Sequence, residues 1–162
     1  MSTSRVTVAA VITLTCISAT SHAQINSSPP PLMGEPSFHI YSVPFVETGA
    51  DRAFFLCTNT TDAAIRVGVE GFAELGGGAI NDASATSLSI AAGGSALFGD
   101  GAVGFSTNSS LGFGGIPVGS ARILATESKG IICTAFVADV GNDPPTSMVH
   151  LNIVKKTKQK GD

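Results

Sequence analysis

The feature that most constrains this chain is a two-residue alternation of apolar and polar side chains that begins at Ser37. It is clearest where Ile65, Val67 and Val69 would line one face of a strand, with the residues between them on the other face. No window of ten or more residues shows the three-four spacing of an amphipathic helix. The core is therefore predicted to consist of strands.

Gly-rich and Pro-rich turns divide this region into about seven or eight short strands. That pattern predicts an all-β fold, an antiparallel β-sandwich, immunoglobulin-like or similar, with a barrel as the rival arrangement. Pro44 indicates an edge or a bulge, Gly71 a second bulge, and residues 127–130 have the length of a hairpin loop. The predicted strands are Phe38–Val46, Arg52–Asn59, a strand from Ile65 through Glu70, one with Leu88 and Ile90, one through Leu97 and Phe98, Ser120–Thr126, Ile131–Asp139 and Met148–Val154.

The first 23 residues have the layout of a secretory signal peptide. One positive charge, Arg5, precedes an uncharged run from Val6 to Ala19, and small residues follow up to Ala23. The run of 14 residues is shorter than the roughly 20 that span a bilayer. We expect cleavage before Gln24 and a protein exported to the periplasm or the extracellular space, with no transmembrane segment left. A retained amino-terminal anchor is the alternative.

The remaining chain has the length of one domain. Residues 24–36 are polar and contain Pro29-Pro30-Pro31, which predicts a Pro-rich linker or a disordered arm. The sandwich domain is expected over residues 37–154, and a basic tail over 155–162. Without Arg5 the chain carries eight basic and twelve acidic residues, a formal charge of −4. Four of those bases lie in the tail, so the acidic body argues against nucleic acid as a partner.

Two cysteines, Cys57 and Cys133, remain after removal of the leader, each in a similar apolar segment. An even pair in an exported protein is more often a disulfide than a metal or catalytic site. A bridge is the prediction, and two buried free thiols are the alternative.

The Gly-rich stretch over residues 99–118 is the leading candidate for a binding surface. Structureless loops of about twenty residues are uncommon in compact domains and are often functional. Its apolar members Phe105, Leu111, Phe113 and Ile116 would contact a ligand, or would fold back to cap one end of the sandwich. Its Gly99-x-Gly101-x-x-Gly104 spacing matches a dinucleotide loop by chance, because no helix follows it.

Two groups of residues could be considered as metal sites. His39 and His150, with a cysteine and Met148, form the residue set of a blue-copper site, but a single ligand-bearing loop near the carboxyl end is missing. Asp139, Asn142 and Asp143 offer oxygens to calcium, although Pro144-Pro145 favours an ordinary rigid turn. We therefore expect no cofactor.

The sequence from Phe54 onward resembles small exported bacterial β-sandwich proteins. The resemblance rests on the apolar strand ending in Cys57-Thr58-Asn59, the segment from Leu88 to Ser95, and the two strands around Arg122 and Cys133. The chain is also similar, faintly, to the sensory rhodopsin transducer group. The resemblance implies a sandwich, in some cases oligomeric, that binds a partner rather than transforming a substrate.

These observations lead to three hypotheses about function. The first is an exported, non-enzymatic sandwich that binds a protein or a glycan at the cell envelope. The second is a structural or assembly component whose strand edges pair with other subunits, which would make the protein a homo-oligomer. The third is a hydrolase with an unrecognised site, which the lack of a Gly-x-Ser-x-Gly elbow disfavours.

Overall fold

The computed structural model describes residues 25–74, 78–100, 106–114 and 118–156. Within them the chain is all β, with no α-helix. Its strands are β1 (Phe38–Val46), β2 (Asp51–Asn59), β3 (Ile65–Ala73), β4 (Leu88–Ile90), β5 (Ser95–Gly99), β6 (Gly119–Ala125), β7 (Ile131–Asp139), β8 (Met148–His150) and β9 (Val154–Lys155).

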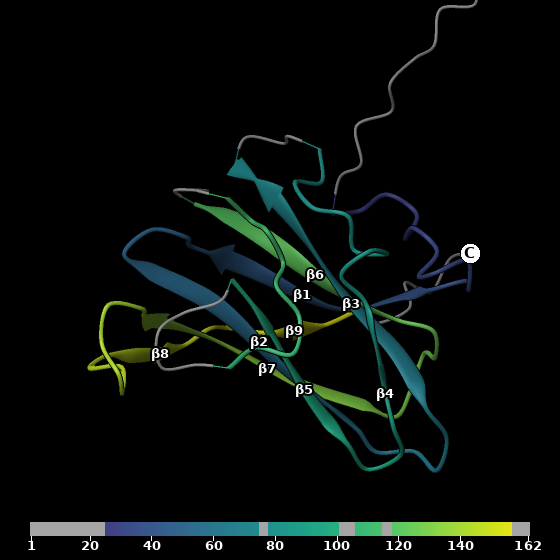
Figure 1. Cartoon of the computed structure of the whole chain (residues 1–162). Helices are drawn as coiled ribbons and strands as arrows, with labels where there is room; N and C mark the ends of the chain where they lie inside the picture. The colour runs from purple at the N-terminus through teal and green to yellow at the C-terminus, as the bar shows by residue number, and fades with distance from the viewer. Residues whose placement is uncertain (1–24, 75–77, 101–105, 115–117, 157–162) are drawn as a thin grey trace, which may run out of the picture.

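The strands form two antiparallel sheets that pack face to face, which confirms the predicted sandwich (Figure 1). One sheet has the order β4-β3-β6-β1-β9 and the other the order β5-β2-β7-β8. The alternation seen in the sequence directs Val67 and Val69 from the first sheet, and Phe55 and Val137 from the second, into one shared core. The bulge expected at Pro44 is present, since the pairing of β1 with β6 shifts register between Val43 and Val46.

The predicted bridge between Cys57 and Cys133 is confirmed. The two residues lie directly opposite each other on β2 and β7, with their Cα atoms 4.1 Å apart, so the disulfide fastens two neighbouring strands of one sheet. It faces the core between the sheets. Because the residues are 76 positions apart, the bridge closes a long loop and strongly restricts the unfolded chain.

The segment predicted as a linker lies against the outer surface of the first sheet. Leu32 is fully buried there and packs with Ala83 and Leu124. Gly68 provides the space, because a Cβ at this position would lie 2.8 Å from the Ala83 carbonyl oxygen and 3.0 Å from Leu32 Cδ2. Burial of the leucine stabilises this arrangement by about 1.5 to 3 kcal/mol. We call residues 25–36 the N-terminal strap.

Three details of the predicted strand pattern are wrong. The expected strand from Met148 to Val154 is two strands, β8 and β9, which lie in different sheets because Leu151 and Ile153 turn toward the core between them. The loop at residues 127–130 is no hairpin, since β6 and β7 belong to opposite sheets. Gly71 forms no bulge, because β3 keeps a regular register with β6 through Ala73.

None of the described residues forms a helix that could cross a membrane. The predicted signal peptide, residues 1–23, lies outside the described part of the chain.

Candidate functional site

The predicted binding loop contributes to the core where the structure describes it. Leu111 and Phe113 are 1% and 2% exposed, and the ring of Phe113 lies edge-on to Phe55 with centroids 6.2 Å apart. Gly71 gives this ring its space, because a Cβ there would lie 2.7 Å from it. These two residues therefore cap the sandwich and are no ligand surface. Phe105 and Ile116 lie outside the described residues.

Asp100 holds the described end of this loop in place. Its two carboxylate oxygens accept hydrogen bonds from the backbone N–H groups of Gly112 and Phe113, at 2.6 and 2.9 Å. The Arg52 guanidinium donates to the Asp100 carbonyl oxygen at 3.2 Å. The carboxylate thus fixes the turn that carries Phe113 into the core.

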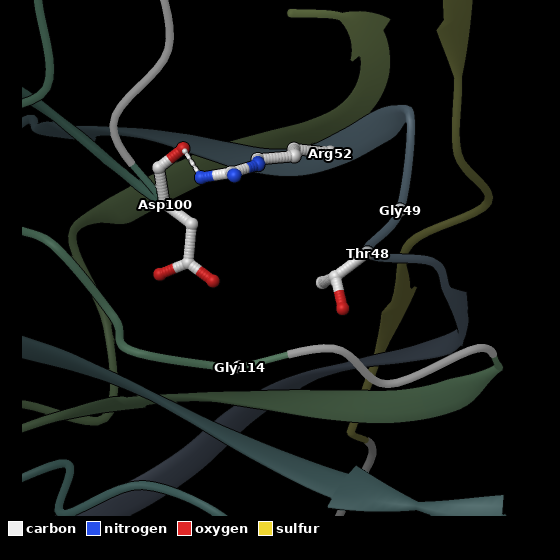
Figure 2. Close-up of a pocket in the computed structure, with 5 residues that line it drawn as sticks. All are labelled: Thr48, Gly49, Arg52, Asp100 and Gly114. Carbon is white, nitrogen blue, oxygen red and sulfur yellow. Dashed lines mark hydrogen bonds between the residues drawn. The ribbon is translucent and has the colours of Figure 1, made fainter.

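A small hollow lies beside this carboxylate. Thr48, Gly49, Arg52, Asp100 and Gly114 line it, and the Asp100 and Thr48 side chains reach into it from opposite sides (Figure 2). Its volume of about 160 Å³ is well below the roughly 300 Å³ at which small-molecule sites begin. Since the loop's own amides already occupy the carboxylate, the hollow offers little to a ligand.

His39 and Ser42 lie together on β1, and their geometry does not suit catalysis. The Ser42 hydroxyl is 2.9 Å from His39 Nε2, but the same nitrogen is 3.1 Å from the Tyr41 carbonyl oxygen. A carbonyl neighbour requires a proton on Nε2, so this nitrogen cannot take the serine proton as a base would. Within the described chain the other ring nitrogen, Nδ1, is buried without a hydrogen-bond partner, so no carboxylate orients the ring.

Burial lowers the pKa of His39 to about 4, helped by the nearby positive charges of Lys156 and Arg122. The imidazole is therefore neutral over the physiological range, and it acts as a packed side chain at this position.

Within the described residues, neither set of weighed metal ligands is brought together as a site. The blue-copper set needs a cysteine thiolate, but both cysteines are in the disulfide, and His39 and His150 lie on different sheets. The Asp139 carboxylate accepts hydrogen bonds from the backbone N–H groups of Thr146 and Ser147 at 2.8 and 3.0 Å, and from the Thr146 hydroxyl. These bonds, led by that of the hydroxyl, lower the pKa of Asp139. The carboxylate closes its own loop, as the rigid-turn interpretation predicts.

The outer surfaces of the two sheets differ strongly. On the first sheet, Glu70 and Arg122 lie opposite each other on β3 and β6, and both are buried. Arg122 Nε and Nη2 each lie 2.6 Å from Glu70 Oε2, and Nη1 donates to the carbonyl oxygens of Ile25 and Ser27 in the strap at 3.1 and 2.7 Å. The guanidinium also lies over the Phe72 ring, 5.2 Å from its centroid. The strap thus completes the surroundings of a buried ion pair.

Among the described residues, no segment covers the second sheet in the same way over much of its outer surface. Ile132 is 62% exposed and Leu56 is 38% exposed, although both lie within strands. Further toward Phe54 and Phe136 the two stacked rings are buried, with centroids 5.4 Å apart. We call the solvent-facing part of this surface the bare face, made up of Leu56, Thr58, Leu97, Ile132 and Thr134.

No member of the bare face is charged, in a chain with twelve acidic residues. Leu56 joins its parts, because it pairs with Leu97 on β5 and with Thr134 on β7. A contiguous, partly apolar and uncharged surface of this kind is typical of protein interaction sites. Sequence reasoning missed the bare face. A signal was present, because β2 and β7 carry apolar residues on both of their faces, so neither strand has a fully polar side.

Comparison with known proteins adds no function: no protein-family model, curated protein or solved structure matches the chain. The resemblance to exported sandwiches and to the transducer group therefore stays a prediction.

Proposed function

We propose that this chain is an exported, non-enzymatic β-sandwich that binds a protein partner at the cell envelope through the bare face. The observation that carries the proposal is the exposure of Ile132, 62%, within an uncharged surface on an otherwise acidic protein. Water-exposed apolar area of this kind is stabilised when a partner covers it.

The disulfide and the sequence leader support the location. Disulfides persist in oxidising compartments, and the Cys57–Cys133 bridge joins two central strands of the sandwich. The signal-like layout of residues 1–23 provides the route out of the cytoplasm. Fractionation of the host cells should find the protein with a mass that corresponds to a chain starting at Gln24.

A protein is the better partner than a glycan for this surface. Sugar rings are commonly bound by stacking on open aromatic rings, but the aromatic residues on this side of the sheet, Phe54 and Phe136, are 0% and 7% exposed. The members of the bare face are aliphatic side chains and threonines. They suit a partner surface that is itself uncharged and partly apolar.

Photo-crosslinking in the exporting cell tests the proposal. A photoreactive residue at Ile132 should form an adduct with another protein. The mass of this adduct should differ from that of a dimer of the chain. The same residue at Ser89, which is exposed on β4 of the other sheet, should not form it. Excess purified wild-type protein should suppress the adduct, whereas Ile132→Lys protein should not. Equal adducts from both positions, or none from Ile132, would overturn the proposal.

A further inference from the structure

The outermost strands of the two sheets are β4, β9, β5 and β8, and three of them are protected against pairing with another chain. On β5, the Leu97 N–H donates to the Asn108 side chain and the Leu97 carbonyl accepts from the Asn108 N–H, both at 2.8 Å. β9 carries Lys155, and on β4 the Ile90 carbonyl oxygen already accepts a hydrogen bond from the Asn59 side chain at 3.0 Å. Such features discourage edge-to-edge association.

The edge at β8 has none of these protections. Met148, Val149 and His150 are all exposed, with Val149 at 63%, and none of them is an acid, a lysine or an arginine. No described segment pairs with the side of β8 that faces away from β7. The strand therefore offers an open edge, in a protein whose other edges are blunted.

The hydrogen bonds on either side of β8 show which backbone groups point outward. Leu151 N–H donates to the Ala135 carbonyl at 2.9 Å, and Asp139 N–H donates to the Ser147 carbonyl at 3.3 Å. Antiparallel pairs alternate between hydrogen-bonded and non-hydrogen-bonded, so Val149 is the next residue that bonds to β7. Met148 and His150 consequently direct their N–H and C=O groups toward the open edge.

We propose that β8 pairs antiparallel with β8 of a second copy of this chain, about a two-fold axis that passes beside Val149. In this register Met148 lies opposite His150 of the second copy, and the two residues exchange both of their outward hydrogen bonds. The same exchange occurs on the other side of the axis, which gives a closed dimer. The two four-stranded sheets then form one continuous sheet.

The second copy is the occupant that the edge fits best, for two reasons. The outward groups are arranged symmetrically about Val149, so the edge is complementary to itself. The exposed valines of the two copies meet at the axis, where no like charges are opposed despite the acidic composition. This inference goes beyond the proposed partner binding and does not depend on it, although dimerisation would bring the two bare faces side by side.

A single added cysteine tests the register. Cα atoms of a non-hydrogen-bonded antiparallel pair are about 4.5 Å apart, which lies within the range of roughly 4.4 to 6.8 Å that disulfides span. Because Cys57 and Cys133 are bridged, a Val149→Cys chain prepared from Gln24 onward, and so without Cys16, has one free thiol and should form a covalent dimer under mild oxidation. Ser89→Cys, at the centre of the other three-residue edge strand, should stay monomeric. Equal dimer from both variants, or none from Val149→Cys, would overturn the proposal.

Charge at the axis provides a second test by analytical ultracentrifugation. The wild-type chain should show a concentration-dependent dimer, and Val149→Lys and Val149→Glu should each weaken it more than tenfold, whereas their equimolar mixture should restore it as a heterodimer. Ser89→Lys is the matched control and should dimerise like the wild type. A wild-type chain that stays monomeric at all concentrations would contradict the proposal. The Ile132→Lys chain should still dimerise, so failure of partner binding and failure of self-association are distinguishable.

Discussion

The outer surfaces of the two sheets are built from similar alternating strands but end in different environments. On the sheet β4-β3-β6-β1-β9, the N-terminal strap covers Leu124 with Leu32 and surrounds the buried Arg122 with backbone carbonyls. On the sheet β5-β2-β7-β8, Leu56 and Ile132 remain open to water. The covered surface contains a buried ion pair, and the bare face contains no charged residue. When an additional segment covers only one side of a sandwich, a strand face with polar residues can be buried beneath it. An apolar strand face on the other side can then remain exposed to solvent.

The two sheets also join their central strands by different interactions, and substitutions can remove each interaction separately. In the open sheet the disulfide joins β2 to β7. Replacing both cysteines, Cys57→Ala with Cys133→Ala, should lower the free energy of unfolding by about 4 to 5 kcal/mol, because the bridge closes a loop of this length in the unfolded chain. Urea unfolding followed by circular dichroism measures the loss. Thiol titration of the unfolded wild-type protein without its leader, which contains Cys16, should find no free cysteine, and two titratable thiols would contradict the bridge.

In the covered sheet the ion pair between Glu70 and Arg122 joins β3 to β6. Arg122→Met should cost about 3 to 4 kcal/mol, since it leaves a buried carboxylate and two strap carbonyls without their donor. The double change Glu70→Leu with Arg122→Met should cost less than the single one, because no unpaired charge remains. Thr134→Ala on the bare face is the control and should stay within about 0.5 kcal/mol of the wild type. Equal losses for Arg122→Met and Thr134→Ala would mean that the strap does not bury the pair.

His39, opposite Leu124 on the covered surface, makes this side of the molecule sensitive to pH. Its pKa is about 4 in the fold and 6.5 as its ordinary value, so the unfolded chain binds the proton first as the pH falls. The stability that the neutral ring contributes is complete above pH 6.5 and is lost between 6.5 and 4. The side chain is only partly buried, so we expect about 1 kcal/mol after solvent screening. Urea midpoints measured across this range should slope less for His39→Gln. An unchanged slope would contradict burial of the ring.

The smallest effect on stability is expected at Ile132, the most exposed member of the bare face. Ile132→Thr should change the free energy of unfolding by less than about 0.5 kcal/mol, because this side chain loses little contact within the molecule. Thermal unfolding measures it. A loss of about 2 kcal/mol would indicate that Ile132 is covered in the folded chain, and the proposed recognition surface would then be wrong.

The sequence predicted the sandwich because alternation and turn residues are local signals. The bounds of β1 and β7 followed from them, whereas the pairing of Cys57 with Cys133 followed from an even number of cysteines in a chain expected to be exported. It could not predict that Glu70 is buried, since its position beside Arg66 and Gly68 is typical of a solvent face until the distant strap is placed. Nor could it predict the bare face, because an apolar residue such as Ile132 looks the same in a strand whether or not another layer covers it.

Hydroxyl-radical footprinting of the purified protein tests the central claim, that a strap covers one sheet and leaves the other open. Radicals modify side chains that water can reach, and mass spectrometry with fragmentation assigns each modified residue. Ile132 should be oxidised and Leu32 protected, even though Met33, the exposed neighbour of Leu32, reacts strongly. Labelling of Leu32 to the same extent as Ile132 would contradict the account.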